Sequence, residues 1–339
     1  MKNIDWKNLP FGYVKTNCNL RAYYKDGKWS DLEVHTSDEV TLSMASNVLH
    51  YGQACFEGMK AFRGKDGKIR IFRLEENARR MQLSAEGIMM QPVPIALFME
   101  ACKKTAKLNE EFVPPFESGA SLYFRPFLIG TGAQVGVSPS TEYMFIVYVT
   151  PVGPYSKTGF NPIDMQLIRD MDRAAPMGTG RFKVGGNYAS SLRASERAKK
   201  EGFNLVLFSD AAERQYIDEA GPANFFAIKG NKYITPKSES ILKSITNMSL
   251  RQIAGDLGME IEQRPVLITE LAEFDEVGAC GTAAVIMPVK KIVDRESGKI
   301  YEYCKDGKAG KISTKLYETL RGIQYGEITD KHHWNTLVE

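Results

Sequence analysis

The sequence predicts a mixed α/β protein of the α+β class, folded into two domains. Its 339 residues exceed the ~100 to 200 residues of one typical domain. Segments with strand-like and helix-like patterns occur in both halves, and a stretch rich in Pro, Gly and Ser, "PVGPYSKTGFNP", separates them. We therefore expect a small N-terminal domain at residues 1–152, an interdomain loop at 153–162 and a larger C-terminal domain at 163–339.

The first half combines strands and helices. Apolar residues recur at helical spacing over residues 74–88 and 94–109, which predicts two amphipathic helices. Turns bound two segments that we expect to be strands, at residues 49–64 and 67–74. Aromatic and β-branched residues are frequent in two further expected strands, at residues 121–130 and 141–153.

The second half begins with a predicted strand at residues 163–170 and a Gly-rich loop that ends at Lys183. A helix through residues 190–202 follows and is closed by Gly202, since glycine commonly ends helices. The remaining expected elements are a strand at 203–210, a hairpin at 224–236 around Gly230 and Asn231, a helix at 245–258 stopped by Gly258, a short acidic helix at 269–277 and an apolar segment at 278–292.

Composition excludes several classes of protein. The net charge is only +3, and the densest basic stretch, at residues 305–317, lacks the interleaved aromatic residues of a nucleic-acid binder, so we interpret it as a solvated face. No apolar run approaches the ~18 residues of a membrane helix, and the N-terminus does not resemble a signal peptide. The five cysteines are widely spaced and form no CxxC pair, which argues against disulfides and zinc. We expect a cytoplasmic protein with reduced thiols, no metal, and neither a nucleic acid nor a membrane as partner.

Two common catalytic designs find little support in the sequence. Only four histidines are present, and His332 and His333 lie in a tail that we expect to be frayed, so a histidine triad is weakly supported. Gly130, Gly132 and Gly136 follow a predicted strand, but their spacing is one residue too long for a dinucleotide fingerprint, and Ser-Pro stands where its helix should begin. A turn is the better interpretation of these glycines.

Lys183, in "GRFKVGGNYASSL", is the strongest candidate for catalysis. A lysine beside a Gly-rich turn is usually a surface residue. Three features downstream favour another role. They are a carboxylate, Glu219, beside a Gly-Pro turn, the free N–H groups of Ile245 and Thr246 at the start of a helix, and a small-residue turn at Gly281–Ala283. An amine, a carboxylate and an anion cradle are the groups that pyridoxal 5'-phosphate requires.

The same residues carry a family resemblance. The segments "LHYGQACFEGMKAFR", "FRLEENARRM", "SLYFRP", "GRFKVGGNYA", "EAGPANFF", "ILKSIT" and "GTAA" occur in the order found in branched-chain amino acid aminotransferases, a family of fold-type IV pyridoxal phosphate enzymes. The chain resembles this family over nearly its whole length. The resemblance implies a small N-terminal α/β domain, a larger C-terminal pseudo-barrel domain, a homodimer, and transfer of the amino group between leucine, isoleucine or valine and 2-oxoglutarate.

The resemblance also implies roles for the coenzyme site. Lys183 matches the Schiff-base lysine, which also moves the proton between the substrate Cα and the coenzyme. Tyr188 matches the tyrosine that hydrogen-bonds the coenzyme phenol, and Glu219 matches the partner of the pyridine nitrogen. The phosphate is implied to bind Arg80, the N–H groups of Ile245 and Thr246, and Thr282. Adjacent helical positions point about 100° apart, so Arg79 should face solvent if Arg80 faces inward.

For the substrates, the resemblance implies an apolar pocket with two sites for carboxylates. Tyr51, Phe56, Tyr123 and Tyr155 match its aromatic wall. The turn at Thr282 and Ala283 matches the amides that take the α-carboxylate, and Arg125 matches the residue that receives the distal carboxylate of glutamate. Val135 and Val137 match a loop that reaches into the neighbouring subunit's site.

Three departures from the family pattern are visible. Pro222 stands where many relatives have Thr or Ser, so a hydroxyl contact is lost. Asn247 replaces the usual Arg or Lys, although an anion cradle made of backbone groups should survive. Ala284 and Met287 replace a CxxC pair of the mammalian enzymes, so thiol-based redox control is not expected at that place.

Alternatives remain open at this stage. D-amino acid aminotransferase and 4-amino-4-deoxychorismate lyase share the fold and use an equivalent lysine and glutamate. The arginine of "YFRP", the "FEGMKAF" segment and the chain length favour the branched-chain enzyme. A nicotinamide-dependent reductase is the alternative from another class.

Overall fold

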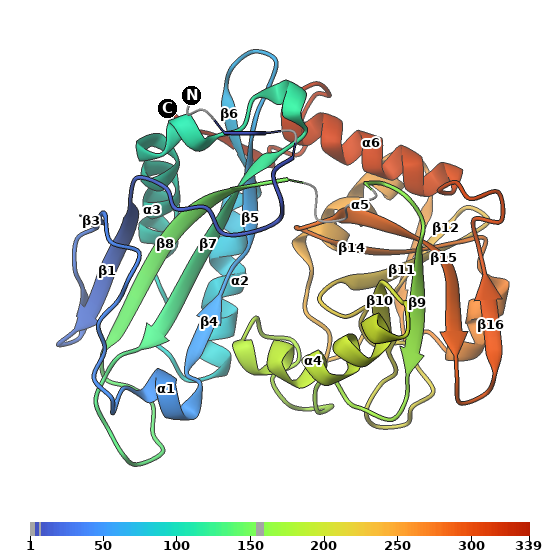
Figure 1. Cartoon of the computed structure of the whole chain (residues 1–339), viewed down its shortest axis with the longest axis horizontal. Helices are drawn as coiled ribbons and strands as arrows, with labels where there is room; N and C mark the ends of the chain where they lie inside the picture. Colours follow the sequence, from blue (N-terminus) through green and yellow to red (C-terminus); the bar gives the residue numbers. More distant parts are fainter. Residues whose placement is uncertain (1–3, 7, 154–158) are drawn as a thin grey trace. The chain divides into compact units, whose positions relative to one another are not determined.

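The computed structural model describes residues 4–6, 8–153 and 159–339, which form two compact units (Figure 1). Unit 1 comprises Met1–Tyr155, Phe182–Gly185 and Gly322–Glu339, and unit 2 comprises Ser156–Arg181 and Gly186–Arg321. The mixed α/β class is confirmed. Residues 154–158 of the predicted interdomain loop lie outside the described residues.

The predicted end of the C-terminal domain at residue 339 is wrong in one respect. Strand β17 (Asn335–Leu337) pairs antiparallel with β6 (Ile69–Phe72), so the C-terminal tail belongs to unit 1. Trp334 is buried there, with its ring edge-on to Phe72. The tail is therefore an edge strand of a sheet and is not frayed. The sequence did not predict this strand because its pairing partner lies far away in the chain.

Unit 1 is built on an antiparallel sheet with the strand order β17-β6-β5-β7-β8-β1-β2, to which β3 adds beside β1 and β4 beside β7. Its other strands are β1 (Asn19–Lys25), β2 (Lys28–Trp29), β3 (Glu33–His35), β4 (Ala54–Phe56), β5 (Met59–Arg63), β7 (Ser121–Gly130) and β8 (Tyr143–Val152). Because side chains alternate along a strand, Phe124 and Leu128 of β7 enter the core while Tyr123 and Arg125 occupy the opposite face.

Two amphipathic helices bury the core face of this sheet (Figure 1). They are α2 (Leu74–Gly87) and α3 (Ile95–Leu108), close to their predicted bounds. Phe98 of α3 stacks on Phe145 of β8 with ring centroids 5.8 Å apart. The short elements of unit 1 are the helix α1 (Asn47–Tyr51) and the 3-10 turns η1 (Glu110–Phe112) and η2 (Phe116–Ser118).

Unit 2 contains a mixed sheet with the order β10-β9-β15-β14-β11-β12-β13, with β16 beside β15. The strands are β9 (Ile163–Ile168), β10 (Leu205–Phe208), β11 (Asn224–Lys229), β12 (Lys232–Pro236), β13 (Glu260–Arg264), β14 (Glu276–Gly281), β15 (Val285–Asp294) and β16 (Lys299–Glu302). The long strand β15 pairs with β14 over Val285 to Pro288 and with β9 from Val289 onward. The register of the β9 pairing shifts between Val289 and Lys291, as a β-bulge would shift it.

Three helices accompany this sheet: α4 (Gly185–Lys200), α5 (Ile245–Asp256) and α6 (Lys311–Tyr325), together with the 3-10 helix η3 (Ile268–Glu273). Ala194 and Ala198 of α4 pack on Ile168, Val206 and Phe208 of β9 and β10. Helix α4 begins five residues earlier than predicted, because the glycines that were interpreted as loop form its first turn.

Two other predicted elements differ from the structure. The strand expected at residues 49–64 is a helix at its beginning, since α1 runs to Tyr51 and is ended by Gly52 in the left-handed conformation. The acidic helix expected at 269–277 is the 3-10 helix η3, after which β14 begins at Glu276. Both errors lie where apolar periodicity is too short to distinguish helix from strand.

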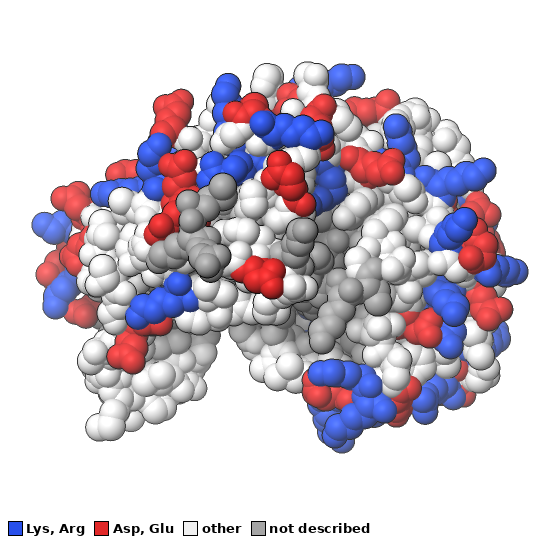
Figure 2. Space-filling view, turned by 45° about the horizontal axis from the view of Figure 1, so that its top comes forward, with Lys and Arg blue, Asp and Glu red and all other residues white. Residues whose placement is uncertain are grey.

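In the part of the chain that the structure describes, no helix is long and apolar enough to cross a membrane. All five cysteines are free thiols. On the face drawn in Figure 2, acidic and basic residues are interspersed without a broad surface of one sign.

Candidate active site

Lys183 is fixed in unit 1 through its main chain. Its N–H donates to Ser84 Oγ of α2 at 2.9 Å, and its carbonyl accepts from the N–H of Phe56 at 3.1 Å. The neighbours Phe182 and Val184 are buried in the core of unit 1, and Val184 bridges Cys55 of β4. Lys183 itself is half-buried, with Nζ 4.9 Å from the centroid of the Phe56 ring. Lys183 is therefore partly shielded from solvent and is not a fully exposed surface lysine.

Arg80 and Arg79 on α2 differ as expected. Arg79 is exposed and pairs with Glu75 one turn earlier, whereas Arg80 is buried. Arg80 donates to both oxygens of the fully buried Glu57, from Nε at 2.8 Å and from Nη2 at 2.7 Å. A bidentate pair of this kind fixes the plane of the guanidinium.

Two residues of this cluster were missed from the sequence. Glu57 is the acid of "CFEGMKAF", and a carboxylate inside an apolar strand pattern was the available signal. Ser84 is the second, because its hydroxyl donates to the carbonyl of Arg80 at 3.0 Å while it accepts from Lys183. One hydroxyl thus links the helix that carries Arg80 to the main chain of Lys183.

The buried thiols of Cys55 and Cys102 are unreactive at neutral pH. Burial, followed by the charge of Glu57, raises the pKa of Cys55 and of Cys102 well above the ordinary value. Since the thiolate is the reactive form, neither cysteine is a nucleophile at neutral pH.

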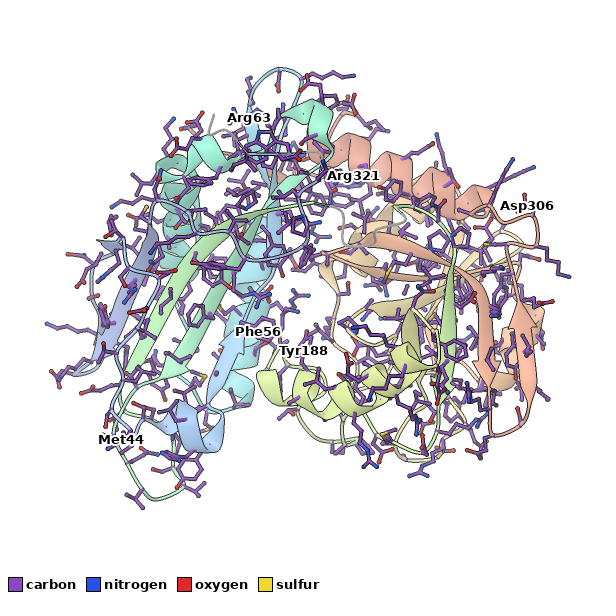
Figure 3. The ribbon with its side chains drawn as sticks, in the orientation of Figure 1. Met44, Phe56, Arg63, Tyr188, Asp306 and Arg321 are labelled. Atoms are coloured by element: carbon purple, nitrogen blue, oxygen red, sulfur yellow. The ribbon has the colours of Figure 1, made fainter. Side chains whose placement is uncertain are left out.

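Phe56, Tyr123 and Arg125 form a second cluster in unit 1, and Figure 3 marks Phe56. The Arg125 guanidinium lies 4.9 Å from the Phe56 ring centroid and 5.5 Å from that of Tyr123, and its Nη2 donates to the Tyr123 hydroxyl at 3.3 Å. Tyr148, opposite Arg125 on β8, joins them. Burial raises the pKa of Tyr148 although the charge of Arg125 lowers it, so its hydroxyl stays neutral at pH 7.

Tyr51 lies apart from these strands. It is in α1, and its hydroxyl donates to the carbonyl of Val135 in the loop after β7. Val135 and Val137 are 87% and 84% exposed, and Met44, marked in Figure 3, is 88% exposed. These four residues form an exposed apolar patch on unit 1, which is unusual for a monomer surface. Tyr155, the last expected member of the aromatic wall, lies outside the described residues.

Glu219 is held in unit 2 between β10 and β11. It is buried, its Oε1 accepts from Asn224 Nδ2 at 3.0 Å, and its Oε2 lies 3.0 Å from Arg173 Nη2. Arg173 is also buried and donates to the carbonyl of Ser240. Neither Asn224 nor Arg173 was identified from the sequence, although the Gly-rich loop that contains Arg173 was.

The N-terminus of α5 presents main-chain N–H groups that could bind an anion. Ser244 caps the helix by accepting from the N–H of Asn247 at 3.2 Å, while no atom of the described residues accepts from the N–H groups of Ile245 and Thr246. Such N–H groups attract phosphate, helped by the helix dipole.

Asn247 connects this helix end to Glu219. Its Nδ2 donates to Asn224 Oδ1 at 3.1 Å and to Thr235 Oγ1 at 2.8 Å, and its Oδ1 accepts from the Tyr233 hydroxyl at 3.0 Å. The departure at Asn247 thus has a structural reason: its amide both donates and accepts in this buried network, whereas a Lys or Arg has no acceptor for the Tyr233 hydroxyl.

Thr282, Ala283 and Tyr188 complete the group in unit 2. Thr282 and Ala283 are half-buried in the turn between β14 and β15, where Val285 has a positive φ of 66°. Tyr188 lies in the first turns of α4 and is marked in Figure 3. The expected site residues thus form two groups, one in each unit.

The comparisons with known proteins agree with the sequence resemblance. A model of the amino-transferase class IV family matches residues 54–292. The branched-chain-amino-acid aminotransferase of Haemophilus influenzae is 47% identical, with 100% of each chain covered, and that of Helicobacter pylori is 45% identical, with 98% of each covered.

Solved structures show the same fold. The Escherichia coli branched-chain amino acid aminotransferase matches with a TM-score of 0.81 at 27% identity, covering 96% of this chain and 100% of the other. The branched-chain amino acid aminotransferase of Thermobaculum terrenum in its PLP-form matches with a TM-score of 0.77 at 27% identity, covering 96% of this chain and 99% of the other. The chain therefore belongs to the class IV aminotransferases and, within them, to the branched-chain amino acid aminotransferase family.

Proposed function

We propose that the chain is a pyridoxal 5'-phosphate-dependent transaminase that moves the amino group between leucine, isoleucine or valine and 2-oxoglutarate. The observation that carries this proposal is Lys183, a half-buried amine whose main chain is fixed on both sides and whose Nζ lies over an aromatic ring. An amine held in this way suits a covalent link to an aldehyde better than it suits a surface charge.

The residues of both groups fit the coenzyme by their chemistry. Glu219 supplies a buried carboxylate for a pyridinium nitrogen. The N–H groups of Ile245 and Thr246, the Thr282 hydroxyl and the Arg80 guanidinium supply donors for a phosphate, and the Tyr188 hydroxyl supplies one for the ring phenol. The bound coenzyme supplies an electron sink for the carbanion formed at the substrate Cα.

The protein's part in the reaction is to position groups and move one proton. Lys183 would hold the coenzyme through its side-chain amine, and the same amine, when free, would move a proton to and from the substrate Cα. Ser84 and the Phe56 N–H hold its main chain in place during both steps. Glu57 keeps the Arg80 guanidinium in one plane, which preserves its donors for the phosphate.

Substrate selection follows from the clusters of unit 1. Phe56 and Tyr123 supply an apolar wall, and one methylene in such a wall is worth only ~1 to 3 kcal/mol, which accounts for acceptance of three branched side chains. Arg125 receives the distal carboxylate of glutamate, and the Thr282–Ala283 turn receives the α-carboxylate.

We also propose a cytoplasmic homodimer in which the patch of Met44, Tyr51, Val135 and Val137 is covered by the second subunit. Two exposed valines on one loop are costly in water and are stabilised by burial in an interface. Because the Tyr51 hydroxyl is bonded to this loop, Tyr51 and the valines would reach the substrate of the neighbouring site together.

The test is half-transamination of the purified protein with L-leucine, D-alanine and aminodeoxychorismate in parallel, followed by the change in coenzyme absorbance. L-leucine should convert the coenzyme fastest. Preference for D-alanine would assign the chain to D-amino acid aminotransferases, and release of pyruvate from aminodeoxychorismate would assign it to the lyases.

A further inference from the structure

Arg173 of unit 2 serves two consecutive carboxylates. Its Nη2 lies 3.0 Å from Glu219 Oε2 and 3.6 Å from Asp218 Oδ2. The residues are 6%, 3% and 3% exposed for Arg173, Asp218 and Glu219. In the described part of the chain, Arg173 is the only cation within ion-pair distance of Asp218.

One guanidinium cannot neutralise two carboxylates. A buried carboxylate without its own partner costs several kcal/mol and usually takes up a proton instead. The Arg173 guanidinium is nearer to Glu219 than to Asp218. Its positive charge therefore stabilises the ionised form of Asp218 less than that of Glu219.

The hydrogen-bond partners make the same distinction. Glu219 accepts from the amide of Asn224, and an amide N–H can only donate, which favours an ionised carboxylate. Asp218 contacts the Ser240 hydroxyl at 2.6 Å, and Ser240 contacts the Ser238 hydroxyl at 2.7 Å with either oxygen able to donate. Hydroxyls can reverse and accept from a neutral carboxyl group.

We propose that Asp218 holds a proton in the coenzyme-free protein and releases it when the cationic ring of the coenzyme binds Glu219. This inference rests on the proposed function. The O–H bond of the Asp218 carboxyl breaks and its proton leaves to water, while the ring supplies the second positive charge. Two cations then face two carboxylates. Asp218 is thus a positioning residue that sets the charge around Glu219.

The surroundings of Asp218 support this assignment. Burial raises its pKa, whereas the bonds from Ser240 and Ser238 and the charge of Arg173 lower it less. Among the described residues, Arg173 is the charged group that acts on Asp218, and its other side-chain partners are the hydroxyls of Ser240 and Ser238.

Infrared difference spectroscopy tests the proton directly. Coenzyme-free protein should show the C=O stretch of a protonated carboxyl group, and this band should be absent from Asp218→Asn. Adding pyridoxal 5'-phosphate to the unsubstituted protein should remove the band. Asp294→Asn is the matched control, because Asp294 is equally buried but pairs with its own arginine, Arg169, at 2.9 Å, so the band should survive there.

Coenzyme affinity against pH gives a second readout. Coenzyme binding to the unsubstituted protein should release one proton more than binding to Asp218→Asn. Below the raised pKa of Asp218, the ratio of the two coenzyme affinities should therefore change about tenfold per pH unit, which gives different slopes in a plot of log affinity against pH. The coenzyme-free Asp218→Asn protein should be at least as stable at pH 7, because it avoids a carboxylate that must take up a proton on folding. A merely structural aspartate would change stability without changing the slope.

The outcomes separate the two claims. A missing band in coenzyme-free protein, a band that persists in Asp218→Asn, a band unchanged after coenzyme absorbance shows binding, or equal slopes would each overturn the inference. A protein that binds no coenzyme at all would instead overturn the proposed function, and the release step with it.

Discussion

The main-chain N–H of Lys183 donates to the Ser84 hydroxyl at 2.9 Å. The same hydroxyl donates to the carbonyl of Arg80 at 3.0 Å, so a single buried serine ties the lysine to the helix that carries Arg80. The position of the reactive amine therefore depends on the packing of α2 as well as on its own loop.

Ser84→Ala should lower the free energy of unfolding by about 1–3 kcal/mol, because the N–H of Lys183 loses its partner in a buried place. We also expect weaker coenzyme binding, measured by absorbance titration. Thr105→Val is the control, since the buried Thr105 hydroxyl donates to the carbonyl of Ala101 in its own helix. If both substitutions affect the coenzyme equally, Ser84 has no special link to Lys183.

Glu57→Gln should be strongly destabilising, by about 3–5 kcal/mol, because it leaves the buried Arg80 charge without its carboxylate. Denaturant unfolding measures this change. Glu75→Gln removes the equivalent partner from exposed Arg79 and should cost less than about 1 kcal/mol. Similar losses for the two variants would mean that the Glu57–Arg80 pair is no stronger than a surface pair.

Arg125→Met should separate the two halves of the reaction. The glutamate half-reaction should fall by about 30-fold or more in kcat/KM, since a buried charge pair is worth roughly 2–5 kcal/mol, while the leucine half-reaction changes much less. Single-turnover absorbance with each substrate is the measurement. Equal losses for leucine and glutamate would remove Arg125 as the receptor of the distal carboxylate.

Val135→Glu combined with Val137→Glu should weaken the proposed dimer, because two charges would have to be buried in its interface. Sedimentation velocity should show monomer at concentrations where the unsubstituted protein is dimeric, with reduced kcat/KM. Ile300→Glu on β16, an exposed apolar site in unit 2, is the control and should leave the assembly unchanged. An unaltered assembly in the double variant contradicts the placement of the loop in an interface.

Acid should weaken the protein partly through Asp294. Burial raises the pKa of Asp294, but the bonds from Arg169 and Ser297 outweigh burial and hold the pKa below its usual value of 3.8. Its stabilising contribution is therefore complete above about pH 4 and lost as the pH falls through the lowered pKa. The stability difference between the unsubstituted protein and Asp294→Asn should be constant from pH 6 to about pH 4 and should shrink at lower pH. A difference that stays constant below pH 4 would show that Asp294 does not titrate there.

Local patterns sufficed for much of the fold. The periodicity of α2 and α3 and the β-branched and aromatic content of β7 and β8 gave bounds within two residues, because each element buries one face or both. β17 and the short α1 were missed, since the first is fixed by a distant partner strand and the second by a few local bonds. Neither leaves a periodic signal.

The candidate site also contains residues with a local sequence signal and residues without one. Lys183, Glu219 and Arg80 could be named as candidates because their motifs surround them in the sequence. Glu57, Ser84 and Arg173 act on those residues across long stretches of chain, through contacts that only folding creates. The usable signal for Glu57 was a charged residue inside an apolar strand pattern. The loop around Arg173 offered no such signal.

The covalent link to Lys183 is the central claim, and reductive trapping tests it most directly. The protein is incubated with pyridoxal 5'-phosphate, reduced with borohydride, digested and examined by mass spectrometry. We expect a phosphopyridoxyl group on the peptide that contains Lys183 and loss of the visible absorbance. A label on another amine, or no label at all, would contradict the account.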